Sequence, residues 1–192
     1  MIVRLSKRMA SFFVRRSIIE KNDEEVYEYG LQLLLSTVLN AAIALLLAIV
    51  SGTVIPCLFY LSAFVVMRKS AGGFHAKTHF GCCCILITVL CCFIAFIRLA
   101  PTNIYIVVSG LSLIISAVTV LLFAPLEHEN KPLSDKDKVR LRKVSIVYII
   151  MISALVILFG VLNLTEIMVS TALGILTSSG SVLAAKMQEK FK

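Results

Sequence analysis

Long apolar runs separated by short polar segments are the main pattern of this chain. A helix needs about 20 residues to cross the hydrocarbon core of a bilayer, and most of the runs have about that length. We therefore predict an all-α fold with six membrane-spanning helices, at residues 31–50, 54–67, 82–100, 104–124, 144–164 and 167–185. The second run is short and contains Pro56, so whether it crosses fully stays open, and we expect Ser178-Ser179-Gly180 to interrupt the sixth.

Residues 1–21 have a different, amphipathic pattern. Apolar side chains recur at roughly helical spacing, at Leu5, Met9, Phe12, Phe13 and Ile19, and basic side chains lie between them, at Arg4, Lys7, Arg8, Arg15 and Arg16. The segment lacks the uninterrupted apolar core and the small-residue cleavage site of a secretory signal peptide. It predicts a helix that lies on the inner membrane surface and contacts anionic lipid, within a cytoplasmic segment at residues 1–30.

The composition also indicates a polytopic membrane protein. The chain is 59% hydrophobic and 16% charged, with a mean hydropathy of +0.95. A soluble domain is about 45–50% apolar and about 25% charged. We therefore expect one integral-membrane domain at residues 1–192, with no separate soluble domain.

The distribution of charge predicts the orientation in the membrane. The N-terminal segment, two polar loops at 68–81 and 125–143, and the C-terminal tail hold six, three, six and three of the nineteen Lys and Arg residues. With six spans, all four segments lie on one side, which the positive-inside rule makes the cytoplasm. This topology accounts for the net charge of +8, so the charge is no reason to predict a nucleic-acid partner.

The candidate chemistry is concentrated at residues 68–84, which hold two of the three histidines and three of the six cysteines. The thiols of Cys82, Cys83 and Cys84 are expected in the first turn of a helix, where the positive end of the helix dipole stabilises a thiolate. Nearby cations have the same effect; they are Arg68, Lys69 and Lys77. A cysteine nucleophile with a histidine base requires this composition. The residues alone leave open which thiol is the nucleophile.

A histidine base has to approach these thiols, and His75 precedes Cys82 by seven residues. That separation is about 10.5 Å along a straight helix, too far for a hydrogen bond. The loop must therefore fold back before the third span. Gly72, Gly73 and Gly81 are placed to allow this, because glycine adopts positive φ angles without steric cost.

Two other classes of function are open at this point. The first is a metal-binding membrane protein, in which His75, His79 and Cys82–Cys84 hold zinc. The second is a transporter of a small solute, because polar residues within spans mark solute pathways; here they are Gln32, Asn40 and Arg98. The remaining cysteines are expected to be small packing residues without disulfides; they are Cys57, Cys91 and Cys92.

Two segments resemble the AgrB (accessory gene regulator B) family. One is Arg68-x-x-x-Gly72-Gly73-x-His75-Ala76, with Cys82 seven residues after the histidine, and the other is Pro125-Leu126-Glu127-His128-Glu129-Asn130-Lys131-Pro132-Leu133. The resemblance implies a cysteine endopeptidase in the cell membrane of a Gram-positive bacterium, with no cofactor. Such an enzyme removes the C-terminal tail of an AgrD-like pro-peptide and allows it to close into a thiolactone or lactone for quorum sensing.

The resemblance also implies roles for single residues. Cys82 is then the nucleophile that forms an acyl-enzyme thioester, and His75 is its base, at the cytoplasmic face. Gln32, or backbone N–H groups at the start of the third span, are candidates to orient His75 or to stabilise an oxyanion. Arg68 and Lys131 are candidates to hold an acidic substrate tail, or else they act only as topology determinants. The implied oligomeric state is a homodimer.

Overall fold

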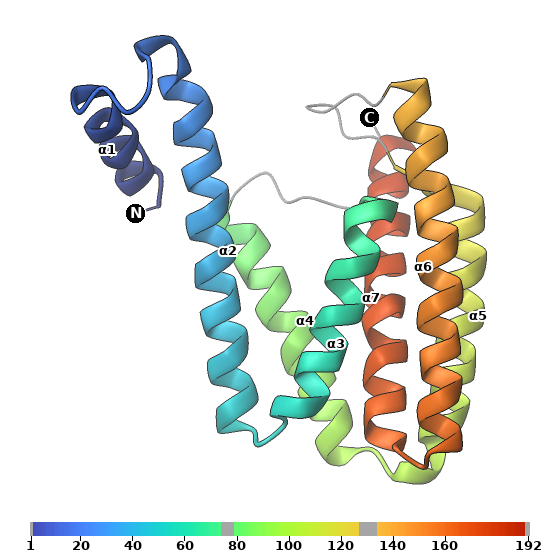
Figure 1. Ribbon diagram of the computed structural model, residues 1–192. Coiled ribbons are helices and arrows are strands. Elements are labelled where there is room, and N and C mark those ends of the chain that lie inside the picture. Colours follow the sequence, from blue (N-terminus) through green and yellow to red (C-terminus); the bar gives the residue numbers. More distant parts are fainter. Residues whose placement is uncertain (1, 74–78, 127–133, 191–192) are drawn as a thin grey trace.

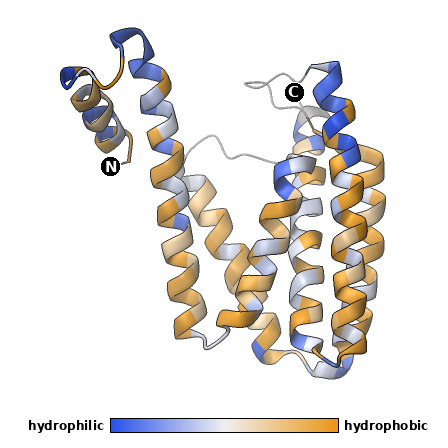
Figure 2. Cartoon of the chain, viewed as in Figure 1, coloured by the Kyte–Doolittle hydropathy of each residue, from blue (hydrophilic) through white to orange (hydrophobic). Residues whose placement is uncertain are grey.

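The computed structural model describes residues 2–73, 79–126 and 134–190, with the side chains at 79, 80, 189 and 190 outside that description (Figure 1). This part of the chain forms seven α-helices: α1 (Ile2–Arg15), α2 (Glu24–Val50), α3 (Val54–Ala71), α4 (His79–Leu99), α5 (Tyr105–Phe123), α6 (Asp135–Val161) and α7 (Thr165–Lys190). Helices α2 to α7 are long and apolar enough to cross a membrane. Figure 2 shows their apolar middle parts side by side, with polar residues gathered at the ends. The predicted all-α fold with six spans is confirmed.

Helices α2 and α6 begin well before their predicted spans, because helices continue beyond the apolar runs into polar sequence. Helix α2 takes in the acidic residues from Glu24 onward, and α6 begins at Asp135 inside the predicted loop at 125–143. The start of α6 is capped by Ser134, whose Oγ accepts the Asp137 N–H at 3.2 Å. Such a cap satisfies one of the N–H groups that have no partner in the first turn.

The predicted interruption of the sixth span is wrong. Helix α7 runs without a break through residues 178–180, and the side chains of Ser178 and Ser179 are buried. Small residues at these positions allow neighbouring helices to approach closely. They mark a packing surface of α7 and not a break in it.

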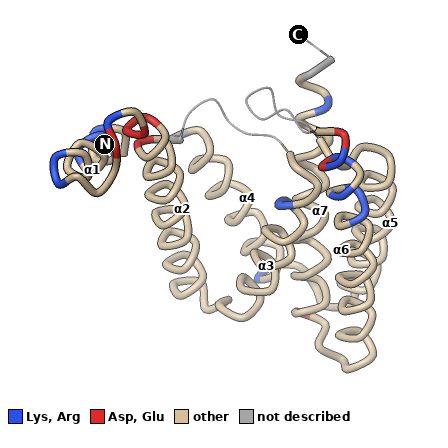
Figure 3. The backbone as a smooth tube through the Cα atoms, turned by 45° about the horizontal axis from the view of Figure 1, so that its top comes forward, with Lys and Arg blue, Asp and Glu red and all other residues tan. Residues whose placement is uncertain are grey.

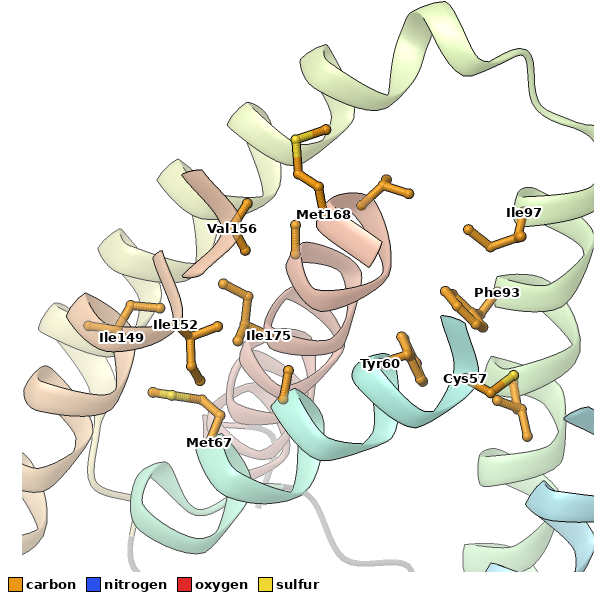
Figure 4. Packing of buried hydrophobic residues seen from close by; sticks show 14 of the residues in the cluster. Cys57, Tyr60, Met67, Phe93, Ile97, Ile149, Ile152, Val156, Met168 and Ile175 are labelled. Carbon is orange, nitrogen blue, oxygen red and sulfur yellow. The ribbon is translucent and has the colours of Figure 1, made fainter. Parts of the chain in front are cut away.

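Helix α7 lies at the centre of the bundle and packs against α3, α5 and α6. Small polar residues line its contact with α5, in the manner of helix pairs within membranes; the buried ones on α5 are Ser109, Ser112, Ser116 and Thr119. Figure 4 shows the apolar part of the core, where Met67, Ile152 and Ile175 from three helices point toward one another. Helix α4 joins the core through the ring of Phe93, which stacks on Tyr60 of α3 at 4.2 Å.

The crossing of α3 and α7 depends on Gly174, which gives a first testable prediction. A Cβ at this position would collide with the backbone oxygen of Tyr60 and lie 3.0 Å from the Cβ of Ala63. We expect Gly174→Ala to lower the free energy of unfolding by about 1–3 kcal/mol, because the helices must separate. Thermal unfolding of the detergent-solubilised protein measures this. The matched control is Gly110→Ala on α5, where an added Cβ meets nothing within 4 Å; equal melting temperatures for the two variants would contradict the prediction.

Helix α1 lies beside the first turns of α2 (Figure 1). It buries the small side chains of Ser6 and Ala10, and the Ser11 hydroxyl donates to Oε1 of Glu24 at 2.6 Å. Leu5 and Phe12 stay exposed. The predicted amphipathic helix is therefore confirmed, and its contact with the membrane surface stays a prediction.

Most charged residues gather at one end of the bundle, as Figure 3 shows. This end contains α1, the start of α2, the end of α3, the starts of α4 and α6, and the end of α7. It is termed the basic end below. The one basic residue predicted at the far end of a span, Arg98, is at the other end, in the last turn of α4.

Candidate functional site

The two polar segments singled out in the sequence meet at the basic end. The backbone N–H of Leu126 donates to the carbonyl oxygen of Ala71, the last residue of α3, at 3.0 Å. The first residues of the second segment therefore lie against the glycine pair that follows α3. The two segments belong to one site.

The glycine pair turns the chain at the end of α3. Gly72 has φ 78° and ψ −156°, a combination that is accessible to glycine and strained for other residues. A Cβ at Gly72 would lie 2.8 Å from the carbonyl oxygen of Leu126. Gly73 has φ 146°, and a Cβ there would strike the hydroxyl of Ser181. Gly72 and Gly73 therefore have the predicted positive φ angles, and the approach of the loop to Cys82 stays a prediction, whereas Gly81 lies inside α4 and makes no turn.

Arg68 joins α3 to α7 at this site. Its Nη1 donates to Oγ of Ser181 on α7 at 3.1 Å, and its guanidinium lies 5.5 Å from the ring centroid of Phe64. The guanidinium also interacts electrostatically with the thiol of Cys82 on α4.

The three neighbouring thiols differ in position. Helix α4 begins at His79, so Cys82 ends its first turn, and Cys83 and Cys84 belong to the second. Cys82 and Cys83 are partly exposed and Cys84 is exposed. The prediction of all three thiols in the first turn is therefore right only for Cys82. Of the three cysteines predicted to be packing residues, Cys57 is buried, whereas Cys91 and Cys92 are exposed.

Several predicted site residues lie outside the described residues. These are His75, Lys131 and the side chain of His79, so their roles remain predictions. Gln32 is described: its Nε2 donates to Oε1 of Glu28 one turn earlier on α2 at 3.3 Å. Helix α2 runs beside α4 (Figure 1).

The alternative functions receive little support from the described structure. Within residues 2–73, 79–126 and 134–190, no group of three His, Cys, Asp or Glu side chains is placed to hold a metal ion. Arg98 lines a cavity of about 690 Å³ at the end of the bundle opposite the basic end, together with Glu166, and its guanidinium donates to the carbonyl of Ser51. Neither Gln32 nor Asn40 lines that cavity, so the three polar residues proposed for a solute pathway do not share it.

Ser181 is a site residue that the sequence did not reveal. It belongs to the run of small residues at 178–181, which is a signal for close helix approach. Leu126 belongs to the second recognised segment, yet its backbone contact with α3 has no sequence signal.

The fold and site together define an integral membrane protein with six spans, in which the end of α3, with an arginine and a glycine turn, and the start of α4, with a cysteine, lie at the same end of the bundle. The AgrB family model, Accessory gene regulator B, matches residues 6–183. The chain belongs to the AgrB family, which is a family of proteases that process AgrD.

Individual relatives agree with this assignment. An AgrB-like protein of Clostridium beijerinckii is 32% identical over 73% of this chain and 71% of its own length. An AgrB-like protein of Listeria innocua is 29% identical over 70% of this chain and 66% of its own length. A second clostridial relative, AgrB-like protein 2 of Clostridium perfringens, is 26% identical over 76% and 71% of the two chains. No solved structure matches this chain with statistical significance.

Proposed function

We propose that this protein is a membrane cysteine endopeptidase that removes the C-terminal tail of an AgrD-like pro-peptide and allows the remainder to cyclise. Family membership supports the processing of such a precursor. The observation that carries the proposed chemistry is the meeting of the two polar segments at the basic end, where the Gly72-Gly73 turn ends α3 and Cys82 lies in the first turn of α4. Cys82 there is partly exposed, so a substrate carbonyl can reach its thiol.

The reaction begins when His75 takes the proton of Cys82. The thiolate attacks the carbonyl carbon of the scissile peptide bond, and the C–N bond breaks as the leaving amine receives the proton from His75. The C-terminal tail departs, and the pro-peptide remains as a thioester on Cys82. An internal cysteine or serine of the substrate then attacks this thioester, which forms a thiolactone or lactone ring and returns the thiol.

Further groups of the site assist these steps. Backbone N–H groups at the start of α4 and the side chain of Gln32 are the candidate donors to an oxyanion. The thioester retains much of the acyl-transfer reactivity of an activated acid, so cyclisation competes with hydrolysis only where water is scarce. A site at the membrane boundary restricts water in this way.

The basic end is the proposed cytoplasmic face of a multi-pass protein of the cell membrane, because cytoplasmic loops carry an excess of Lys and Arg. Lys131 and the cations of residues 136–143 would hold the acidic tail of the pro-peptide there. Contact of α1 with anionic lipid and a homodimer are parts of the same proposal. The exposed apolar side chains of α2, such as Leu34 and Leu46, suit either lipid or a second copy.

Co-expression with an AgrD-like pro-peptide tests the proposed activity. We expect the protein to yield the free C-terminal tail and a second fragment that is one water lighter than the linear peptide, because a side chain of the substrate attacks the thioester in place of water and no water is added. Mass spectrometry of membrane extracts distinguishes the cyclic from the linear fragment. Cells with the pro-peptide alone are the control. An intact precursor in the presence of verified, membrane-inserted protein would contradict the proposal.

A further inference from the structure

The cavity at the end of the bundle opposite the basic end is lined by two isolated and opposite charges, Arg98 of α4 and Glu166 of α7. The turns at this end, at residues 51–53, 100–104 and 162–164, contain no charged residue. Among the described residues, most of the other charges lie at the basic end (Figure 3). We propose that this cavity, termed the Arg98–Glu166 cavity below, binds the headgroup of a zwitterionic phospholipid, whose phosphate contacts Arg98 and whose primary ammonium group contacts Glu166.

The guanidinium of Arg98 is held by the turn between α2 and α3. Its Nη2 donates to the carbonyl oxygen of Ser51. Gly52 in the same turn has φ 64°, and a Cβ there would lie only 2.6 Å from Nη2 of Arg98, so the glycine leaves the space that the guanidinium occupies. A guanidinium has five N–H donors in a planar fork that matches a phosphate group. Most of these donors are therefore available to a ligand in the cavity.

The two charges share the cavity without neutralising each other. Within residues 2–73, 79–126 and 134–190, neither Arg98 nor Glu166 forms an ion pair, and both side chains are exposed. A carboxylate accepts strong charge-assisted hydrogen bonds from an ammonium group, as a guanidinium donates them to a phosphate. A ligand that carries a phosphate and an ammonium group therefore has the charge pattern opposite to that of the cavity.

Apolar side chains at the same cavity favour a lipid over a soluble zwitterion. Val54, Ile55 and Leu164 line the cavity, and all three are exposed. Leu58, one turn after Ile55 on α3, is exposed as well. An apolar surface therefore runs along α3 from the cavity toward the middle of the span, where the acyl chains of a bound phospholipid would lie. With the basic end in the cytoplasm, this lipid belongs to the outer leaflet.

Native mass spectrometry of the full chain in detergent tests this inference. The protein is equilibrated with equal amounts of phosphatidylethanolamine and phosphatidylglycerol that have the same acyl chains, and the bound lipids are counted. We expect phosphatidylethanolamine to be retained about tenfold more, because only its headgroup has an ammonium group for Glu166. Glu166→Gln should abolish this preference, and Arg98→Gln should lower the retention of both lipids about tenfold. The matched control is Glu25→Gln, which removes the same charge at the basic end and should keep the preference.

Glu166→Gln is the decisive variant, because the Glu166 carboxylate forms no ion pair with another described residue, whereas Arg98→Gln also alters the contact with Ser51. Arg98→Lys keeps the cation and should retain more of both lipids than Arg98→Gln. Equal or greater retention of phosphatidylglycerol by the unsubstituted protein, or a preference that survives in Glu166→Gln, would overturn the inference. Equal retention of phosphoethanolamine, the headgroup without acyl chains, would also overturn it, since a soluble zwitterion would then be sufficient. Lipid retention is measured without a pro-peptide, so failure of the proposed peptidase activity would leave this result unchanged.

Discussion

Replacing Cys82 with alanine is expected to reduce release of the pro-peptide tail more than about 1,000-fold, because no acyl-enzyme forms without the nucleophile. His75→Ala should lower kcat about 100- to 10,000-fold, the range that a general base contributes. Both effects are measured from the ratio of precursor to cleaved fragments after co-expression. Variants with normal membrane levels and normal melting temperatures are required for the comparison.

Neighbouring residues of the same type provide the controls for that prediction. Cys83→Ala and His79→Ala should retain cleavage, because neither residue has a role in the proposed reaction. Successive residues of a helix point about 100° apart, so the side chain of Cys83 has a different direction from that of Cys82. Undiminished cleavage by Cys82→Ala would mean that another thiol is the nucleophile. Loss of cleavage in His79→Ala, together with bound zinc in the purified protein, would favour the metal-binding alternative.

The membrane fold could be predicted from the sequence because the length of an apolar run is a local property. The run that ends at Val50 and the turn that follows it are found in the structure where the pattern indicated them. Helix starts were less predictable. Helix α6 begins at Asp135, in a segment with many charges. Outside the hydrocarbon core a helix does not need an apolar surface, and a capping residue is enough to start it.

The site could be predicted only where its residues are close in sequence. Arg68, Gly72, Gly73 and Cys82 lie in one segment, so a spacing pattern was enough to group them. The bond between Arg68 and Ser181 joins residues 113 positions apart. Such a contact depends on how α7 packs against α3, which the small residues of α7 permit but do not specify. Small residues at 178–180 are compatible with either a break or close helix packing, and the sequence alone does not distinguish the two.

Alanine at the two glycines of the turn is expected to have two different effects. Gly72→Ala places a Cβ in a strained backbone conformation, which costs about 1–3 kcal/mol, and drives it against a backbone oxygen that cannot rotate away. It should therefore lower both the melting temperature and kcat/KM, the latter about tenfold or more. Gly180→Ala on α7 is the control, because an added Cβ there meets nothing within 4 Å. Equal melting temperatures and equal kcat/KM values in Gly72→Ala and Gly180→Ala would exclude a steric role for Gly72.

Gly73→Ala should destabilise the protein less than Gly72→Ala, because its φ of 146° is also strained for alanine but the atom that its Cβ meets is a side-chain hydroxyl that can rotate. Rotation of Ser181 relieves the collision but removes the acceptor from Arg68. We expect kcat to fall about tenfold with a smaller loss of melting temperature than in Gly72→Ala. Adding Ser181→Ala to Gly73→Ala should recover part of the melting temperature, because the hydroxyl no longer collides while the φ of 146° stays strained for alanine, and it should leave kcat low because the acceptor is still missing. Recovery of kcat in the double variant would mean that Gly73 acts through space alone, and that the fixed position of Arg68 has no part in catalysis.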